Sequence, residues 1–202
     1  MILAALILQA AAPQSAVDAE RAFAAAAQAK GQWTAFRETA APDAVMFQPG
    51  PVKALDWMKG KADPPKAVEW WPTESYVSCD GTLAVNTGGW KRPNGTVGYF
   101  TTVWQRQADG GWKWVMDHGD VTNAPREKPL EPKIVRAVCG GIYVPSGNND
   151  RISKVGSGLS KDTSLIWKWT VRADGSRDFS ANIWNGNGMT QVVHDVVAAE
   201  TP

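Results

Sequence analysis

The stretch Gly98-Tyr-Phe-Thr-Thr-Val-Trp-Gln-Arg-Gln-Ala-Asp-Gly-Gly-Trp-Lys-Trp-Val-Met-Asp-His-Gly-Asp120 decides how this chain folds. It contains two runs in which large apolar side chains alternate with other residues, joined by Ala108-Asp-Gly-Gly111. Alternation with a period of two predicts strands, and a glycine-containing turn between two such runs predicts a β-hairpin. The register of this hairpin matters because it decides which side chains share a face of the sheet.

Turns at Asp109-Gly110 and Asn94-Gly95 predict the register of two neighbouring hairpins. The first turn gives the expected pairs Gln107–Trp112, Gln105–Trp114, Val103–Met116, Thr101–His118 and Tyr99–Asp120. The second gives the expected pairs Pro93–Thr96, Trp90–Tyr99, Gly88–Thr101 and Asn86–Val103. One face is therefore expected to carry Asn86, Trp90, Tyr99, Thr101, Val103, Trp112, Trp114, Met116, His118 and Asp120. The opposite face is expected to carry Leu83, Val85, Phe100, Trp104, Val115 and Asp117.

His118 carries the sharpest chemical hypothesis, because this register places it beside Tyr99 and Asp120. A histidine oriented by a carboxylate can move a proton near neutral pH, and a tyrosine hydroxyl can donate to a developing oxyanion. His118, Tyr99 and Asp120 are therefore the candidate catalytic residues. The alternative is a structural histidine hydrogen-bonded to a backbone carbonyl. The candidate ligand-binding residues on the same face are Asn86, Trp90, Thr101, Trp112, Trp114 and Met116.

The sequence gives no sign of a metal, a cofactor or a nucleic-acid partner. Asp117 should point away from His118 and Asp120, since alternate residues of a strand face opposite sides. No three ligands occur at a recognised spacing, so we expect no metal and no cofactor. The 21 Lys and Arg balance 20 Asp and Glu without a basic run, which argues against nucleic acid. Eleven tryptophans indicate either a tryptophan-rich core or an aromatic surface for a ligand.

The N-terminus is typical of an exported protein. Residues 2–8 are apolar, and small-residue sites ending at Ala12 or Ala16 follow, which predicts a signal peptide over residues 1–16. The alternative is an Ala-rich N-terminal helix. No stretch has the length of a membrane span. With the predicted signal peptide, the expected location is the periplasm or the medium. There, Cys79 and Cys139 either form a disulfide or stay as two separate buried thiols.

The remaining patterns predict an α+β fold. Apolar residues at helical spacing predict helices over residues 17–30, 32–41 and 54–59. Runs with a period of two predict strands over residues 45–47, 68–79, 83–92, 134–138, 164–172, 177–184 and 189–198. The last three of these strands should form a meander. Residues 140–161, rich in Gly, Ser and Asn, predict a long loop, and Pro125, Pro129 and Pro132 mark a linker.

Three segments carry a resemblance to a known family. They are the helix with Glu20-Arg-Ala-Phe23, the stretch Ala41-Pro-Asp-Ala-Val45, and Trp104-Gln-Arg-Gln-Ala-Asp-Gly-Gly-Trp112 followed by Asp117-His118. In these the chain resembles the SnoaL-like branch of the nuclear transport factor 2-like superfamily, over residues 17–122. The resemblance implies a cone in which a curved sheet wraps the N-terminal helices around an apolar pocket. Superfamily members include isomerases, dehydratases, cyclases and hydrolases beside binding and assembly domains, so the fold alone does not decide the function.

The expected organisation is a signal peptide (1–16), a SnoaL-like domain (17–122), a Pro-rich linker (123–132) and a β extension packed on the sheet (133–202). The leading hypothesis is an exported protein that binds an apolar or aromatic small molecule in the cone. One alternative is a cofactor-independent isomerase, lyase or hydrolase that uses His118 as acid and base. Another is an interaction or assembly module, such as a homodimer, that uses the second apolar face of the sheet.

Overall fold

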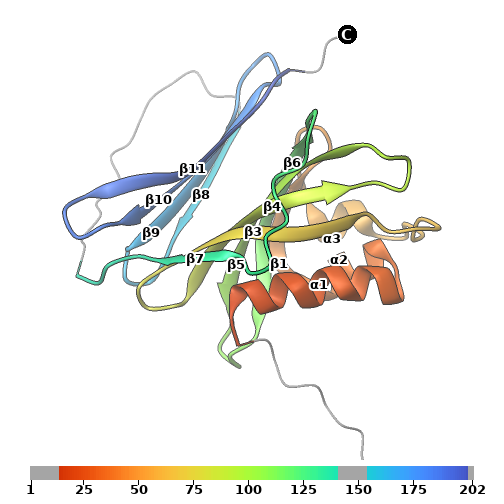
Figure 1. The fold of residues 1–202 in the computed structure, drawn as a ribbon. Coiled ribbons are helices and arrows are strands. Elements are labelled where there is room, and N and C mark those ends of the chain that lie inside the picture. Colours follow the sequence, from red (N-terminus) through yellow and green to blue (C-terminus); the bar gives the residue numbers. More distant parts are fainter. Residues whose placement is uncertain (1–13, 141–153, 200–202) are drawn as a thin grey trace, which may run out of the picture.

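The computed structural model describes residues 14–140 and 154–199. Two sheets face each other, and the N-terminal helices lie on the other side of the larger sheet (Figure 1). The predicted fold class is confirmed: the chain is α+β, with a large curved sheet on N-terminal helices and a C-terminal β meander. Most of the predicted signal peptide lies outside the described residues.

Three helices cover the larger sheet: α1 (Ala16–Lys30), α2 (Gln32–Thr39) and α3 (Ala54–Met58). The first begins after Ser15, whose hydroxyl accepts a hydrogen bond from the Asp18 amide while the Asp18 carboxylate accepts one from the Ser15 amide. Such a capping box satisfies amides that the first turn of a helix leaves free. The buried stripe of α1 consists of Ala16, Val17, Ala19, Glu20, Phe23 and Ala27.

The larger sheet has seven strands in the order β2-β1-β6-β5-β4-β3-β7. Their bounds are β1 (Ala40–Phe47), β2 (Pro51–Lys53), β3 (Glu69–Val77), β4 (Leu83–Lys91), β5 (Val97–Arg106), β6 (Trp112–Val121) and β7 (Lys133–Arg136). The two predicted hairpins form its antiparallel centre, while β1 pairs with β6 and β7 with β3 in parallel. Between β6 and β7, the predicted linker (123–132) contains no helix or strand.

The predicted β5–β6 register is correct in the half of the hairpin far from the turn and wrong near the turn. The Gln107 amide donates to the Gly111 carbonyl, so the loop has three residues (108–110), and it ends on Gly110 at φ +84°. Glycine adopts this left-handed conformation without strain. The pairs near the turn are Arg106–Trp112, Gln105–Lys113 and Trp104–Trp114. A bulge after Val103 then shifts the register by one, which confirms the predicted pairs Val103–Met116, Thr101–His118 and Tyr99–Asp120.

The predicted β4–β5 register is wrong throughout. The Arg92 amide donates to the Thr96 carbonyl, which again makes a three-residue loop, with Gly95 at φ +89°. No bulge compensates in this ladder. The observed pairs are therefore Trp90–Gly98, Gly89–Tyr99, Thr87–Thr101, Asn86–Thr102 and Val85–Val103.

A shift of one residue in the pairing turns the side chains of a strand to the other face of the sheet. The candidate site residues that were expected on one face are therefore divided between both faces. The face toward the helices carries Ala84, Asn86, Trp90, Phe100, Thr102, Trp104, Trp112, Trp114 and Asp117. The face toward the second sheet carries Leu83, Val85, Tyr99, Thr101, Val103, Met116 and His118.

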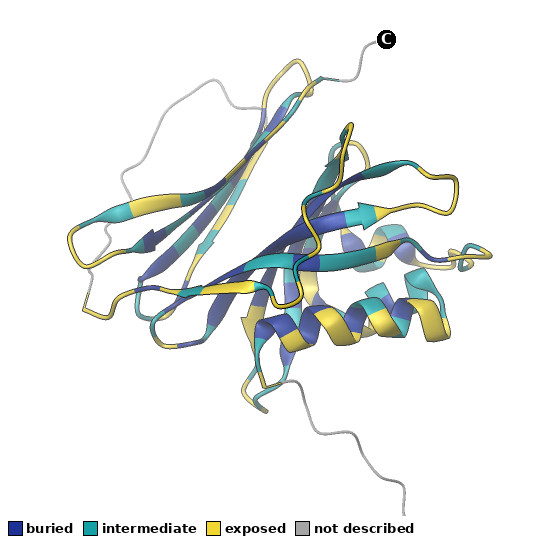
Figure 2. Ribbon diagram, viewed as in Figure 1, coloured by how far each residue is buried: buried dark blue, intermediate teal, exposed yellow. Residues whose placement is uncertain are grey.

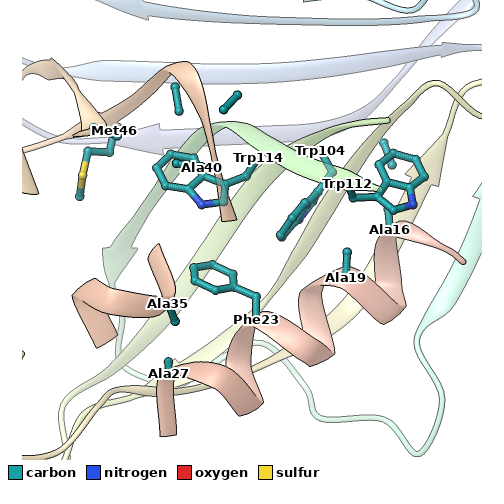
Figure 3. Packing of buried hydrophobic residues seen from close by; sticks show 14 of the residues in the cluster. Ala16, Ala19, Phe23, Ala27, Ala35, Ala40, Met46, Trp104, Trp112 and Trp114 are labelled. Carbon is teal, nitrogen blue, oxygen red and sulfur yellow. The ribbon is translucent and has the colours of Figure 1, made fainter. Parts of the chain in front are cut away.

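Phe23 lies at the centre of the helix-side core. Its ring centroid is 4.6 Å from that of Phe36, 4.8 Å from Trp70 and 5.9 Å from Trp104, all in edge-to-face contact. Figure 3 shows Phe23 pointing from α1 toward Trp104 and Trp114 on the sheet. Much of the tryptophan excess therefore serves as core volume, because edge-to-face rings bury large apolar areas with defined geometry.

The second sheet has the order β11-β10-β9-β8, with bounds β8 (Lys154–Leu159), β9 (Leu165–Val171), β10 (Arg177–Trp184) and β11 (Met189–Val197). The meander is confirmed, but β8 lies in the segment predicted as a long loop. A Cβ at Gly156 would lie 2.4 Å from the Trp169 ring, and one at Gly158 would lie 2.8 Å from Trp167. These glycines therefore let indole rings approach the strand, rather than forming a flexible loop.

Both faces of the larger sheet are buried, as the dark strand interiors in Figure 2 show. The core between the two sheets contains residues that expose none of their surface, namely Val85, Val103, Met116, Leu165, Phe179 and Ala181. The apolar second face therefore does not require a partner chain, because the C-terminal sheet already covers it.

Two similar loops hold the sheets together at one end. Ser78-Cys-Asp-Gly-Thr-Leu83 joins β3 to β4, and Ser160-Lys-Asp-Thr-Ser-Leu165 joins β8 to β9. The Asp80 amide donates to Asp162 Oδ2 at 2.9 Å, and the Asp162 amide donates to Asp80 Oδ2 at 3.1 Å. We call this pair of loops the aspartate clasp. Hydrogen bonds from Ser78 and Thr82 lower the pKa of Asp80 against the opposing effect of burial.

A disulfide lies beside the clasp. Cys79 bonds to Cys139, and their Cα atoms are 5.2 Å apart. The bond connects the clasp loop to the chain just beyond β7. Together with the Arg136 guanidinium, which donates to the carbonyl oxygens of Ser78 and Cys79, it holds β7 to this corner of the sheet.

Asp162→Ala should lower the free energy of unfolding by about 1–3 kcal/mol, because it leaves the Asp80 amide without its acceptor across the sheets. Asp80→Ala combined with Asp162→Ala should cost less than the sum of the single losses, because each removes one of two reciprocal bonds and the loss of either bond loosens the other. Urea unfolding at pH 7 measures all three. Asp174→Ala is the control, because Asp174 accepts bonds only within its own turn among the described residues. Additive losses would show that the clasp does not couple the sheets.

Candidate functional site

The cavity between the helices and the larger sheet is the candidate functional site. Its volume is about 790 Å³, within the range of small-molecule sites. Its inner part is lined by the aromatic side chains Phe23, Phe36, Trp57, Trp70 and Phe100. Its outer end is lined by Phe47, Trp90, Arg92, Gly119, Asp120 and Arg177. The aromatic walls suit an apolar ring system, and the polar side chains in the same lining could contact polar groups that the rings carry.

Glu20 on α1 is a fully buried carboxyl group in the wall of this cavity. Its Oε1 accepts a hydrogen bond from Trp70 Nε1 at 2.9 Å, and its Oε2 accepts one from Trp104 Nε1 at 2.7 Å. Asn86 Nδ2 lies 3.4 Å from the same Oε2. Burial raises the pKa of Glu20 to about 7; repulsion from Asp117 adds to the rise and the hydrogen bonds reduce it.

Asp117 on β6 is the second carboxyl group of the cavity. It is half-buried, and its Oδ2 accepts a hydrogen bond from Thr102 Oγ1 at 2.6 Å. Burial raises the pKa of Asp117 to about 7, against the lowering effect of the Thr102 hydroxyl.

The two carboxyls have no counter-charge. Within residues 14–140 and 154–199, no Lys, Arg or His nitrogen lies within 4 Å of either group. Two buried acids that repel each other lose their protons in two steps that belong to the pair. Near neutral pH, the cavity therefore holds both a proton donor and a proton acceptor against apolar walls.

The predicted catalytic residues lie mainly on the other side of the sheet. His118 exposes none of its side chain, so it borders the cavity through its main chain. Burial lowers the pKa of His118, which keeps the imidazole neutral. The Tyr99 hydroxyl is buried and has no hydrogen-bond partner among the described residues. Asp120 accepts a hydrogen bond from the Val121 amide, and the carboxylate that lies within 4 Å of His118 in the described residues is that of Asp195 instead.

Asp195 on β11 takes the place that was predicted for Asp120. Its Oδ2 lies 3.2 Å from His118 Nε2 and accepts a hydrogen bond from Thr101 Oγ1 at 2.6 Å. The His118 contact is close, yet its angle falls short of a hydrogen bond. Asp195 Oδ1 is paired with Arg126 Nη2. The buried polar group thus fastens the second sheet and the linker to the first sheet.

The predicted ligand-binding residues do not form one site. Trp90 lines the outer end of the cavity, and its Nε1 donates to the Tyr99 carbonyl oxygen at 2.8 Å. Asn86 donates to the Ala16 carbonyl oxygen at 2.8 Å. Trp112 and Trp114 lie in the helix-side core, whereas Thr101 and Met116 lie between the sheets. The corrected β4–β5 register and the bulge in β6 explain this division.

Sequence reasoning missed Glu20, Asp117, Thr102 and Asp195. One signal was available for Glu20, because a single acid among the buried alanines of an amphipathic helix is unusual. Asp117 was correctly placed opposite His118, but the pocket was assigned to the wrong face. Asp195 carried no signal, because its contact with His118 spans two sheets.

The described residues contain no group of three or more His, Cys, Asp or Glu side chains arranged to hold a metal ion. In the same part of the chain, none of the helices combines the length and the apolar character of a membrane span.

No protein family matches the sequence, and no curated protein is similar enough to be called a relative. Several solved structures are similar in fold. A candidate ketosteroid isomerase from Parabacteroides distasonis is 17% identical, with 57% of this chain and 94% of that chain covered and a TM-score of 0.45. A candidate ketosteroid isomerase from Shewanella frigidimarina is 21% identical, with coverage of 52% and 95% and a TM-score of 0.40.

The CaMKII hub of S. rosetta is also similar, at 19% identity, with 57% of this chain and 100% of that chain covered and a TM-score of 0.41. These structures differ widely in function. The likeness therefore determines neither the ligand, the reaction nor the assembly of this chain.

Asp117→Asn should change how stability depends on pH. The pKa of Asp117 is raised to about 7 in the folded chain, so its contribution is complete below about pH 4 and is lost as the pH rises through 7. Between pH 5 and pH 8, wild type should lose about 1–3 kcal/mol more free energy of unfolding than Asp117→Asn. Asp43→Asn, at an almost fully exposed site on the adjacent strand, is the control. Parallel curves for wild type and Asp117→Asn would contradict the raised pKa.

Proposed function

We propose that this protein binds an apolar or aromatic small molecule in the cavity between the helices and the larger sheet. The observation that carries the proposal is the pairing of aromatic walls with two carboxyls that lack a counter-charge, Glu20 and Asp117. An apolar ring system would replace water against these walls. A hydroxyl or carbonyl group of the ligand would then find Asp117 and the Thr102 hydroxyl as its polar contacts.

A second function, proton transfer at carbon, is favoured by the pKa of Asp117. A carboxylate that titrates near pH 7 is matched to removing a proton from a carbon acid. In that step the Asp117 carboxylate takes a proton from the carbon next to a ketone. The C–H electron pair moves into the enolate, and the protonated acid returns a proton to carbon. Glu20 would act on Asp117 through repulsion, so it is a positioning residue.

This assignment moves the acid–base role away from His118. The imidazole is enclosed between the sheets and held beside Asp195, which favours a structural role. The isomerase, lyase or hydrolase alternative therefore continues with Asp117 in place of His118. The assembly alternative loses its main support, because the second sheet covers the apolar face on which it depended.

The test uses 2-tetralone, an aromatic-fused ketone, in D₂O with observation by proton NMR. We expect saturable binding to wild type, and we expect protein-dependent exchange of the hydrogens next to the carbonyl for deuterium. Asp117→Asn should lower that exchange at least about tenfold, since the amide cannot take the proton. Asp43→Asn should match wild type, because Asp43 is exposed on β1.

The outcomes separate the two functions. Binding without exchange would leave a binding protein and overturn proton transfer. Exchange that is equal in wild type and Asp117→Asn would assign the chemistry to another group. Absence of both binding and exchange would contradict the proposed site.

We also infer export to the periplasm or the medium. The apolar residues 2–8 and the small residues after them support it, and an oxidising compartment suits the disulfide between Cys79 and Cys139. The Ser15 cap of α1 favours the small-residue site that ends at Ala12 over the predicted end of the signal peptide at Ala16. Removal of such a cap costs about 1 kcal/mol.

Protein recovered from the periplasm or the medium should therefore lack residues 2–8 and retain Ser15. Intact-mass measurement after expression of the full chain in a bacterial host tests this. A chain that starts at Met1 and stays in the cytosolic fraction would contradict export. A mature chain that starts after Ala16 would contradict the role of the cap.

A further inference from the structure

Arg177, at the start of β10, is a buried cation at the outer end of the cavity. It is 6% exposed and lines the cavity beside Gly119 and Asp120. Its Nη1 donates to the Pro49 carbonyl oxygen at 3.2 Å, and its Nη2 donates to the Gly119 carbonyl oxygen at 3.1 Å. Backbone carbonyls orient a guanidinium but do not neutralise its charge.

The guanidinium also stacks on an aromatic ring. The Arg177 Cζ lies 4.3 Å from the centroid of Phe47 on β1. Stacking and two carbonyls hold the planar group in one orientation, and this leaves its Nε buried without a partner among the described residues. A buried donor without a partner costs free energy, and a hydrogen-bond acceptor at this nitrogen would remove that cost.

Arg177 forms no direct ion pair with a carboxylate of the described chain. None lies within 4 Å of its guanidinium in residues 14–140 and 154–199. The oxygens of Asp195 are taken by Arg126, Thr101 and His118, and Asp120 accepts from the Val121 amide. The charges of Asp120 and Asp195 therefore act on Arg177 at longer range, and neither group contacts the guanidinium directly.

Other polar atoms near Arg177 are also unsatisfied. The Tyr99 hydroxyl and the His118 Nδ1 are both buried without a hydrogen-bond partner in the described part of the chain. Their ring centroids are 6.1 Å apart, and the charge of Arg177 acts on both groups. Tyr99 is not among the residues that line the cavity, so the donor that the cavity offers an anion here is the Arg177 guanidinium.

We infer that the outer end of the cavity is a carboxylate-binding subsite centred on Arg177. This inference rests on the proposed function and specifies its ligand: an apolar ring system that carries a carboxylate. The ligand's rings would occupy the aromatic part of the cavity, and its carboxylate would accept hydrogen bonds from the Arg177 guanidinium. Arg92, which also lines the outer end, adds a second positive charge at the entrance, and Asp120 offsets one of the two.

The spacing of the strand supports a ligand of this kind. Arg177 binds the carbonyl of Gly119, which is two residues from Asp117 along β6. Two residues of a strand span about 7 Å, so a ring system reaches from the cation to the carboxyl pair. The cavity thus offers a positive group at one end and proton-exchanging acids at the other.

The test compares two probes of nearly equal shape, 2-naphthoate and its neutral amide 2-naphthamide, by isothermal titration at pH 6. At this pH the naphthoate is ionised, whereas Glu20 and Asp117 are largely protonated and repel it little. Wild type should bind naphthoate at least about tenfold more tightly than naphthamide. Arg177→Gln should abolish that preference and change naphthamide affinity less than about twofold.

Arg172→Gln is the matched control, because Arg172 precedes the same turn but is exposed and pairs with Asp178 outside the cavity. It should keep the wild-type preference. Wild type provides a test that does not depend on the variant folding: higher salt should weaken naphthoate binding and leave naphthamide binding unchanged. Arg177→Lys, which keeps the charge, should retain part of the preference.

Equal binding of the two probes by wild type would overturn the carboxylate subsite and leave the proposed function in place. Absence of binding by either probe would overturn both. A preference for naphthoate that Arg177→Gln preserves and Arg172→Gln removes would place the anion elsewhere and overturn the assignment to Arg177.

Discussion

The larger sheet carries apolar side chains on both faces, and the rest of the fold follows from the need to cover them. Trp104 and Trp114 face the helices, whereas Val103 and Met116 face the second sheet. An uncovered face of this kind would associate with other apolar surfaces. The helices and the second sheet cover the two faces in different ways. The second sheet buries an apolar core with the larger sheet, while the short helices border the cavity that is lined by aromatic rings.

Polar contacts determine how the second sheet sits on the first. The reciprocal bonds of Asp80 and Asp162 hold one end, and Asp195 binds Thr101 and Arg126 within the interface. Apolar packing alone tolerates sliding, but buried polar groups lose free energy unless their partners are in place. His118, the candidate catalytic residue of the sequence analysis, lies beside Asp195 in this interface. Its imidazole is buried between the sheets, away from the cavity, and this is why the acids on the other face become the better candidates.

The cavity has an uneven distribution of charge. Among the described residues, Glu20 and Asp117 lie against apolar rings without a cation within 4 Å, and Arg177 lies at the outer end without a carboxylate within 4 Å. Each arrangement is costly in an empty protein, because burial disfavours an uncompensated charge. A ligand that carries a polar group at one end and an anion at the other would relieve both costs. The same burial that makes the site costly brings the acids into the pH range where they exchange protons.

The sequence by itself determined the strand-rich hairpins, the amphipathic first helix and the α+β class, because these depend on local periodicity and turn chemistry. It also gave the pairing of Thr101 with His118 correctly, although only because a longer turn and a bulge cancelled. Register at β4–β5 failed because Asn94-Gly95 fits a two-residue or a three-residue loop, and a difference of one residue inverts the faces. Only the tertiary structure decided that Asp195 lies beside His118 and that Glu20 and Asp117 line the same cavity. Those contacts join elements far apart in the chain, and no local pattern encodes them.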